Sequence, residues 1–308
     1  MALNRGRSLR ARTFSLALAL VFGSFLSASA SVRSEDPAQT GDKAASPGSG
    51  ERLTLKRAGQ DFLSDAGRIW SSPFRLKERH VGPLILLAAT TGLLIATDED
   101  THRGLRTFAD ENGWVGDVSS AITTLGGAGA WAAAGLFFGA GVVMKDIRAR
   151  DTGFLAVNAI LQSFLVSHTI KGLSGRQRPL AAEGEDRWSG PAGLFKRYAS
   201  GNYGLYDSFP SGHAATAFSL ATVVALQYRH RTWVGVLAYS LAAMASVSRV
   251  TEDRHWMSDV VAGAVLGHLV ARVVVLNHQK RQRLVPVLGC SGRSVIVGFH
   301  YALDPVRR

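Results

Sequence analysis

The chain has a single cysteine, Cys290, among its 308 residues. An internal disulfide needs two cysteines and a cysteine-rich metal site needs several, so the sequence excludes both. Charged residues are also scarce, at 19% against 46% hydrophobic residues, which is an apolar balance for a soluble protein. We therefore expect a fold that depends on the packing of apolar segments.

Acidic residues are absent from the first thirty positions, which carry four arginines, Arg5, Arg7, Arg10 and Arg12. An apolar run, Phe14–Leu26, and a small-x-small pattern at 28–30 come next. This succession predicts an export signal over residues 1–30, with an uncleaved signal anchor as the alternative. Residues 31–51, rich in Ser, Pro, Gly and Ala, are typical of a disordered linker, and 52–80 form a polar or amphipathic lead-in.

The net charge of +12 suits a nucleic-acid-binding protein as well as a membrane protein. However, the basic residues fall in short clusters between apolar blocks, and no stripe interleaves them with aromatic residues. Membrane topology explains such clusters better, because cytoplasmic loops are enriched in Lys and Arg. We expect no nucleic-acid partner.

Six apolar blocks follow the lead-in, at about 81–97, 118–144, 153–170, 209–228, 232–248 and 258–276. Each is close to the roughly 20 residues that a helix needs to cross a bilayer. The sequence therefore predicts an all-α fold, with a transmembrane six-helix core over 81–277. Gly135 and Gly139, spaced for close helix packing, lie in the second block, near the tandem glycines Gly126 and Gly127.

The C-terminal tail, residues 278–308, differs from the rest of the chain. Its residues alternate around Gly289 to Gly292 as in a β-hairpin, so we predict a short hairpin-like segment there without assigning it a function.

Basic residues flank the blocks at 75–79, 145–150, 229–231 and 280–283, whereas the loop between the first two blocks is acidic. The positive-inside rule then puts the intervening loops outside the cytoplasm. A cleaved signal followed by six full crossings would give the opposite orientation. Three interpretations therefore stay open: an uncleaved N-terminus, a different number of crossings, or a core that is not fully transmembrane.

Three polar segments fall at the block ends that this rule places outside. The first, Lys171–Pro179, has a lysine and an arginine seven residues apart, close enough to two helical turns to share a direction. The second, Phe209–Phe218, begins FPSGH, and Pro210 suits the first turn of a helix whose exposed N–H groups can bind an anion. The third, Ser248–Asp259, has His255 and Asp259 four apart, on one helix face.

Each segment alone has an ordinary explanation as a helix flank, a cap or a surface pair. Together they read K-x6-RP, PSGH and SR-x5-H-x3-D in this order, which resembles the type 2 phosphatidic acid phosphatase and vanadium haloperoxidase superfamily over roughly residues 81 to 276.

The resemblance implies a metal-independent phosphatase. It makes His255 the nucleophile that forms a phosphohistidine, Asp259 the residue that orients it, and His213 the general acid. The phosphate-binding residues that it implies are Lys171, Arg178, Ser211, Gly212 and Arg249. Arg176 and Arg254 lie near the site and could assist it, but we favour their interpretation as solvated charges. Trp256 could anchor the chain at the membrane interface.

The apolar blocks favour lipid phosphates as substrates, namely phosphatidate, phosphatidylglycerophosphate or an isoprenyl pyrophosphate. A soluble exported acid phosphatase and a vanadium-dependent haloperoxidase are the alternatives, since the same three motifs serve all of them; a non-catalytic scaffold is disfavoured because no motif position is lost. We expect no cofactor, with vanadate binding as a phosphate mimic. The expected location is the inner membrane of a bacterial envelope, with the site facing the periplasm, or alternatively the soluble periplasm.

Overall fold

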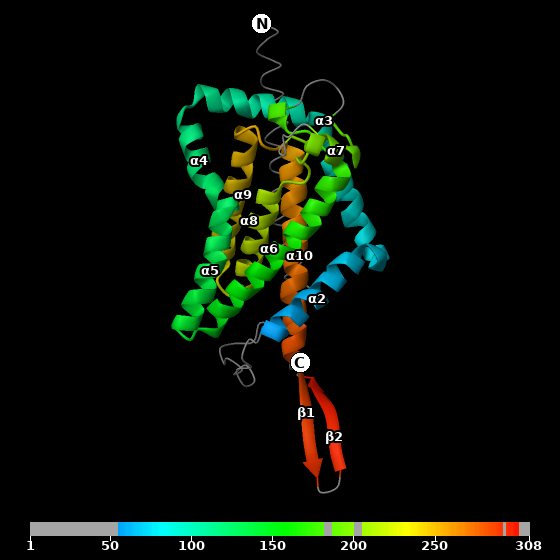
Figure 1. Ribbon diagram of the computed structural model, residues 1–308. Helices are drawn as coiled ribbons and strands as arrows, with labels where there is room; N and C mark the ends of the chain where they lie inside the picture. The colour runs from blue at the N-terminus through cyan, green and yellow to red at the C-terminus, as the bar shows by residue number, and fades with distance from the viewer. Residues whose placement is uncertain (1–54, 182–186, 200–204, 292–293, 302–308) are drawn as a thin grey trace. The chain divides into compact units, whose positions relative to one another are not determined.

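The computed structural model describes residues 55–181, 187–199, 205–291 and 294–301. The predicted export signal and linker lie outside these residues. The helices, in chain order, are α2 (Leu55–Ser71), α3 (Glu78–Glu111), α4 (Trp114–Gly126), α5 (Ala128–Val143), α6 (Ile147–Ser174), α7 (Ala192–Ala199), α8 (Gly212–Gln227), α9 (Thr232–Thr251) and α10 (Met257–Arg283). Short 3-10 helices occupy Ser72–Arg75 and Pro179–Ala181. The all-α fold is therefore confirmed (Figure 1).

The chain divides into two compact units, residues 58–278 and a second unit made of 1–57 and 279–308. The first contains almost all of the helical core. In the second, strands β1 (Leu284–Ser291) and β2 (Ser294–Tyr301) pair antiparallel, with Leu284 opposite Tyr301 and Ser291 opposite Ser294.

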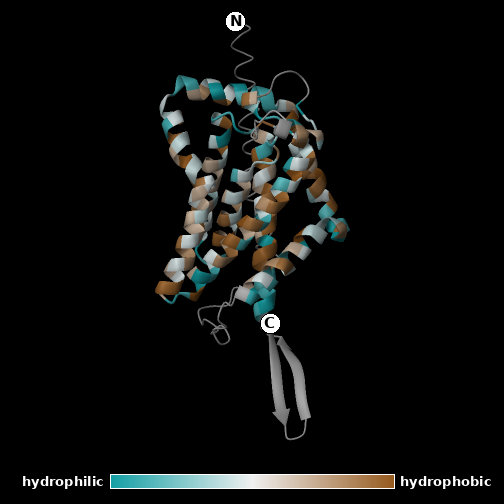
Figure 2. Cartoon of the chain, viewed as in Figure 1, coloured by the Kyte–Doolittle hydropathy of each residue, from teal (hydrophilic) through white to brown (hydrophobic). Residues whose placement is uncertain are grey.

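Within the described residues, four helices are long and apolar enough to cross a membrane: α3, α6, α9 and α10. A fifth span results if α4 and α5 count together, although they meet at a 49° bend. Not all six predicted segments form a single long helix, because the second block breaks at Gly127 and the fourth forms a helix only from Gly212, which leaves α8 with 16 residues. The number of crossings stays a prediction. In Figure 2 apolar residues run along the helices, and polar residues gather towards their ends.

Helix α3 packs little of its apolar stretch against the rest of the protein. Only 6% of this stretch is buried. Its exposed apolar side chains are Val81, Leu84, Ile85, Leu86 and Leu93. Since a helix in lipid has no need to hide such residues, this surface suits contact with acyl chains.

Close backbone contact holds α10 against α8. A Cβ atom at Gly263 would collide with the carbonyl of Ser211, and one at Gly267 with the carbonyl of Ala215. Small residues spaced four apart let helices approach in this way. The spacing therefore fixes the first turn of α8 beside α10.

The glycine pair singled out from the sequence does not pack in this manner. A Cβ atom at Gly135 or Gly139 would meet nothing within 4 Å, so the prediction of close packing there is wrong. The tight contact between α5 and α6 is made by Gly141 and Gly153, where an added Cβ would strike the backbone of the facing helix. Helical spacing alone does not say which face of α5 meets α6.

Helix α2 is held to the core by polar contacts. The buried carboxylate of Asp65 accepts hydrogen bonds from Asn158 of α6, at 2.8 Å, and from Asn277 of α10, at 2.9 Å. Gln162 donates to the carbonyl oxygen of Phe62 at 2.9 Å. Because hydrogen bonds can join helices where the hydrophobic effect is weak, these contacts anchor α2 beside α6 and α10.

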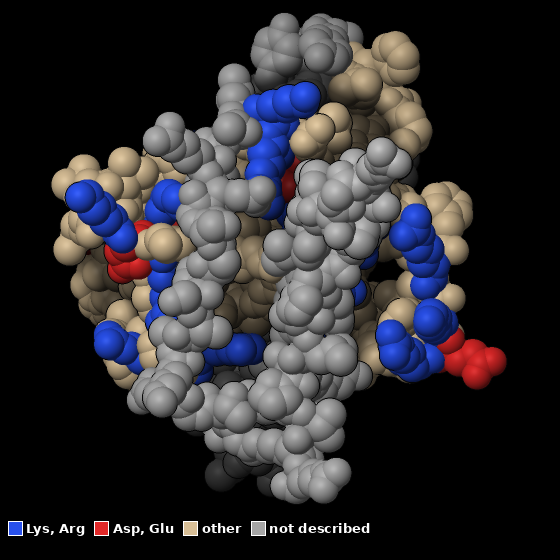
Figure 3. Space-filling model, turned by 90° about the horizontal axis from the view of Figure 1, so that it is seen from below, with Lys and Arg blue, Asp and Glu red and all other residues tan. Residues whose placement is uncertain are grey.

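The two ends of the helical core differ in chemistry. The α5–α6 and α8–α9 turns lie at one end and carry the basic residues Lys145, Arg148, Arg150, Arg229 and Arg231. Figure 3, which views this end, shows Lys and Arg side chains around the face and few Asp or Glu. The end of α6, the start of α8 and the α9–α10 turn lie at the opposite end, as Figure 1 shows. The three predicted motifs therefore meet at one end of the core.

Candidate active site

The chain reverses direction where α6 ends. Gly175 has a left-handed backbone (φ 53°), and a Cβ atom there would collide with the carbonyl of Gly190. Residues 174–178 then hydrogen-bond to residues 187–190 on one side and to 205–208 on the other. These three segments pass across the helix ends and carry several of the site's side chains.

Lys171 and Arg178 both reach Asp207, but not from one helix. The chain turns at Gly175, so Arg178 lies beyond the end of α6. The prediction that both residues point the same way from one helix is therefore wrong. Nε and Nη2 of Arg178 each lie 2.9 Å from Oδ1 of Asp207. Nζ of Lys171 donates to the carbonyl oxygen of Asp207 and lies 4.0 Å from Oδ2.

The PSGH segment opens α8 later than expected. Ser211 is the N-cap, and its Oγ accepts a 3.4 Å hydrogen bond from the amide of Ala214. Pro210, which follows a cis peptide bond, therefore precedes the helix instead of occupying its first turn. The Ser211 amide donates to the carbonyl of Asp259 at 2.9 Å, which ties this segment to α10. Gly212 follows the cap, and an added Cβ there would lie 3.9 Å from Cε of Lys171.

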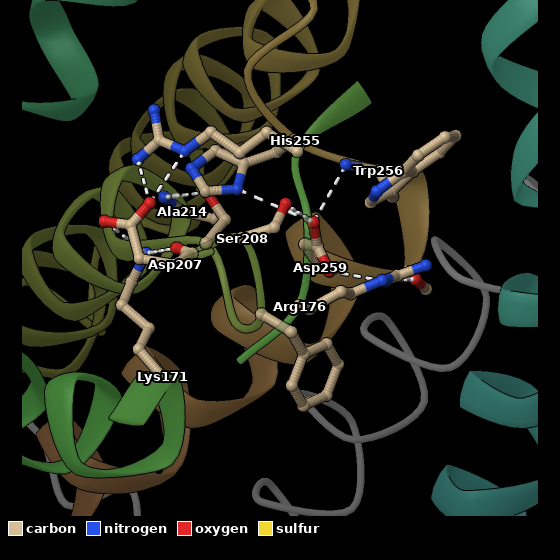
Figure 4. Close-up of polar contacts among 12 residues, drawn as sticks. Lys171, Arg176, Asp207, Ser208, Ala214, His255, Trp256 and Asp259 are labelled. Atoms are coloured by element: carbon tan, nitrogen blue, oxygen red, sulfur yellow. Dashed lines mark hydrogen bonds and ion pairs between the residues drawn. The ribbon is translucent and has the colours of Figure 1, made fainter. Parts of the chain in front are cut away.

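His255 and Asp259 come together across a turn. Helix α10 begins at Met257, so His255 lies outside it, and the expectation that both residues share a helix face is wrong. Nδ1 of His255 nevertheless lies 3.6 Å from Oδ2 of Asp259. Figure 4 shows the His255 ring with Asp259 on one side and Asp207 on the other. With Nδ1 turned towards the carboxylate, Nε2 is the nitrogen left to face a substrate.

The carboxylate of Asp259 is fully buried and hydrogen-bonded on both oxygens. Oδ2 accepts from the Ser208 hydroxyl at 2.5 Å and from the Trp256 amide at 2.9 Å, and Oδ1 accepts from Nη1 of Arg176 at 2.5 Å. A buried charge is stable only when it is paired and hydrogen-bonded in this way. These contacts fix the position of the carboxylate beside His255.

Arg176 is not the solvated charge that we expected from the sequence but a buried residue with 1% exposure. Its Nη2 donates to Oδ2 of Asp98 at 2.7 Å, while Nη1 holds Asp259. Asp98, on α3, also accepts from the amide and hydroxyl of Ser258. The guanidinium therefore joins two buried carboxylates from helices α3 and α10. By contrast, Arg254 is exposed, as expected.

Trp256 is buried, with 3% exposure, so its expected role at the membrane interface is wrong. Its Nε1 donates to the carbonyl oxygen of Gln177 at 2.8 Å. The guanidinium carbons of Arg176 and Arg187 lie 5.5 and 4.8 Å from its ring centroid. Trp256 therefore packs the turn before α10 against the segments that leave α6.

Arg249, in the last turn of α9, is positioned by α4. Its Nη1 donates to Thr123 Oγ1 at 2.7 Å and to Glu252 Oε2 at 2.5 Å. Its buried Nε finds no hydrogen-bond partner among the residues that the structure describes. The arginine is thus anchored at one nitrogen and keeps donors for an anion.

His213 packs against the break between α4 and α5. A Cβ atom on Gly127 would lie only 2.9 Å from its Nε2, so any larger residue there would make the ring shift. Burial lowers the pKa of His213 to about 4, and the nearby charges of Arg249, Lys171 and Arg178 act in the same direction. The imidazole is therefore neutral until an anion between these cations favours its protonated form.

His255 is also neutral at ordinary pH. Burial lowers its pKa to about 4; Asp259 acts in the opposite direction, and Lys171 and Arg178 add to the lowering. A neutral imidazole keeps the lone pair that a nucleophile needs. No three His, Cys, Asp or Glu side chains group as metal ligands in the described part of the chain.

The structure brings together all eight residues that the resemblance implied, at the ends of α6, α8, α9 and α10. Sequence reasoning missed Asp207, Ser208, Asp98 and Thr123, which hold the motif residues in place. Asp98 directly follows the first apolar block and begins the acidic run 98–100, so in the sequence it looks like a helix flank. The other three lie in no pattern that marks them.

Comparisons with known proteins agree with the motifs. Residues 152–283 match the PAP2 superfamily. Over 68 residues the chain is 46% identical to the lipid A 1-phosphatase of Porphyromonas gingivalis, an alignment that spans 22% of this chain and 15% of that protein. The similarity thus concerns a short part of the relative's length.

Two solved structures resemble the chain at low sequence identity. A transmembrane PAP2-type phosphatidylglycerolphosphate phosphatase from Bacillus subtilis matches with a TM-score of 0.47 and 22% identity, over 73% of this chain and 98% of that one. LpxE of Aquifex aeolicus matches with a TM-score of 0.43 and 18% identity, over 58% and 94% of the two chains.

Proposed function

The chain belongs to the PAP2 superfamily through residues 152–283, and we propose that it is a membrane phosphatase that hydrolyses phosphate monoester or pyrophosphate groups of lipids. One observation supports this most: a neutral imidazole, His255, is paired with a fixed carboxylate beside three cationic side chains. Such a set can bind a phosphoryl group and attack it.

The proposed reaction has two steps. Nε2 of His255 attacks phosphorus, the bond from phosphorus to the leaving oxygen breaks, and a phosphohistidine forms. The proton that the leaving oxygen needs comes from His213. In the second step water attacks phosphorus, His213 takes a proton from it, and the bond to Nε2 breaks to release phosphate.

The cations stabilise the charge that spreads over the phosphoryl oxygens during both steps. Lys171, Arg178 and Arg249 supply positive charge, and the backbone amide of Gly212 lies at the N-terminus of α8, where anions are favoured. Ser211 caps the helix through its Oγ and so sets the direction of that amide. No metal has a step in this mechanism, and vanadate is expected to bind as a phosphate mimic.

The position of the site supports a lipid substrate. Each of the four helices long enough to cross a membrane contributes a residue to the site or its supporting contacts, and the exposed apolar surface of α3 leads to the end where Asp98 and Arg176 lie. We propose that this end faces the periplasm, because the opposite end carries the basic turns. Phosphatidate, phosphatidylglycerophosphate and isoprenyl pyrophosphate types all fit these requirements.

The test is an assay of the purified full chain with a short-chain phosphatidate, measured as released phosphate. The same protein, loaded with vanadate, is given peroxide and bromide. Phosphate release without bromination supports the proposal. Bromination without phosphate release would make the protein a haloperoxidase, and a preference for water-soluble phosphate esters would favour the acid phosphatase alternative.

A further inference from the structure

We propose that Asp207 is a selectivity residue of this site: its carboxylate occupies the phosphate-binding cations until a doubly charged phosphomonoester displaces it, and singly charged phosphodiester headgroups cannot. The inference rests on the proposed function, and it names the charge class of substrate that the site accepts.

The contacts of Asp207 are those expected of an internal anion. Oδ1 lies 2.9 Å from both Nε and Nη2 of Arg178, and Oδ2 lies 4.0 Å from Nζ of Lys171. The side chain is only 13% exposed, so water screens these charges weakly. The carboxylate therefore uses the same donors that would otherwise bind phosphoryl oxygens.

The backbone around Asp207 is fixed on both sides. The amide of Arg178 donates to the carbonyl of Leu205, and the amide of Ser208 donates to the carbonyl of Arg176, both at 3.0 Å. Lys171 also holds the carbonyl of Asp207 itself. Because the backbone is held, we propose that the carboxylate leaves Arg178 by rotation of its own side chain.

The cations that contact Asp207 explain why the proposed ligand is a dianion. Lys171 and Arg178 both lie against its carboxylate, whereas Arg249 pairs with Glu252. When Asp207 turns away, the two positive charges of Lys171 and Arg178 are available to the ligand. A phosphomonoester carries up to two negative charges at neutral pH and matches that number.

A phosphodiester carries a single negative charge and has two free oxygens, whereas a phosphomonoester has three. Binding of a diester would replace the carboxylate by an anion of the same charge with few free acceptors for Arg178 and Lys171. Its binding free energy would therefore not repay the displacement of Asp207. Since a site discriminates through the difference between two affinities, an internal competitor of this kind rejects the weaker anion. Most headgroups in a bilayer are diesters, so this rejection would keep the site available.

Asp207 could instead serve only to orient Arg178 and Lys171 for the substrate. The two roles predict opposite results when the charge is removed. An orienting carboxylate that is lost leaves the cations misplaced, and anions bind more weakly. A competing carboxylate that is lost leaves the cations available, and anions bind more tightly.

The experiment measures binding to the purified full chain by calorimetry, at a pH where inorganic phosphate is a dianion. Inorganic phosphate and dimethyl phosphate are the two probes, the second being a singly charged diester. The variants are Asp207→Asn and, should that protein not fold, Asp207→Ser. Asp151→Asn is the matched control, because it removes a carboxylate that pairs with Arg150 at the opposite end of α6.

We expect Asp207→Asn to bind phosphate about fivefold more tightly or better, in the range of ordinary coupling between two ligands. Dimethyl phosphate should bind this variant measurably and bind the wild type and Asp151→Asn poorly. Unchanged or weaker phosphate binding by Asp207→Asn would overturn the proposal. Because binding is read without turnover, a wild type that releases no phosphate from lipids would refute the proposed function and still leave this test readable.

Discussion

Nη1 of Arg176 donates to Oδ1 of Asp259 at 2.5 Å, so the carboxylate beside the proposed nucleophile is itself held by a buried cation. The other end of that guanidinium binds Asp98, 2.7 Å away on α3. The position of His255 thus depends on a chain of charges that begins on a different helix.

Replacing Arg176 by alanine should cost about 3–5 kcal/mol of folding free energy, the usual result of leaving buried charges without a partner. Phosphate release should fall as well, because Asp259 loses the group that fixes it. Thermal unfolding and turnover measure the two effects. The control is Arg254→Ala, an exposed position in the turn before α10, which should change the unfolding free energy by no more than about 0.5 kcal/mol. Equal stability of the two variants would contradict the role given to Arg176.

Alanine at position 127 should lower kcat by about tenfold or more, since a displacement of a catalytic group by a fraction of an ångström is costly. The new Cβ would lie 2.9 Å from Nε2 of His213 and push the ring from its place. KM should change less, because the cations are untouched. Gly135→Ala, which meets nothing within 4 Å, is the control and should keep wild-type kcat.

Removing either histidine should abolish most turnover while the protein still folds. His255→Ala lacks the nucleophile and should fail with every substrate. His213→Ala should lose about 100- to 10,000-fold with a lipid phosphate, the usual contribution of a general acid. With p-nitrophenyl phosphate, whose leaving group needs no proton, the first step should be slowed less, whereas the second step is the same for both substrates. An equal slowing of the first step, measured before the first turnover ends, would argue against the acid role of His213.

The low pKa of His255 predicts the pH at which the free enzyme loses its nucleophile. Burial sets this pKa at about 4, below the ordinary 6.5, so the imidazole is neutral and active above pH 4 and becomes protonated as the pH falls through that value. NMR of protein with ¹⁵N-labelled histidine should show this titration, with His255→Ala identifying the signal. A midpoint near 6.5 would contradict the prediction.

The orientation of the core can be tested with a reporter placed between Lys145 and Arg150. We expect a cytoplasmic readout, because basic turns remain on that side. A second reporter between Glu111 and Trp114, where α3 ends and α4 begins, should give the opposite readout. A periplasmic signal from the first reporter would place the candidate site in the cytoplasm and refute the proposed location.

Much of the site was predictable because the motif residues lie at fixed spacings. Lys171, His213 and His255 could be assigned to one end of a helical bundle from the order of apolar and basic segments. Their local geometry could not be derived, since the left-handed turn at Gly175 and the start of α10 at Met257 depend on how the segments pack. The sequence spacing therefore predicted correctly that Lys171 and Arg178, and His255 and Asp259, lie close together. It was wrong in assuming that each pair lies on one helix.

The residues that hold the motifs were harder to find. In the sequence, Arg176 is one of several arginines in a basic loop. Only the folded chain shows that it pairs with Asp98, which is distant in sequence. Thr123 and Gly127 act from α4 and the α4–α5 break, outside the segment that matches the superfamily. Long-range contacts of this kind leave no local pattern, so only the folded chain reveals them.

The contact of Gly263 and Gly267 with the backbone of α8 has a mechanical consequence. The main chains of the two helices are in contact there, so we expect the helices to move together. His213, in the first turn of α8, and His255, just before α10, therefore keep their separation when the surrounding bilayer thins, thickens or tilts the bundle. Changes in lipid composition should then alter how a headgroup reaches the site, and leave the spacing between nucleophile and proton donor as it is.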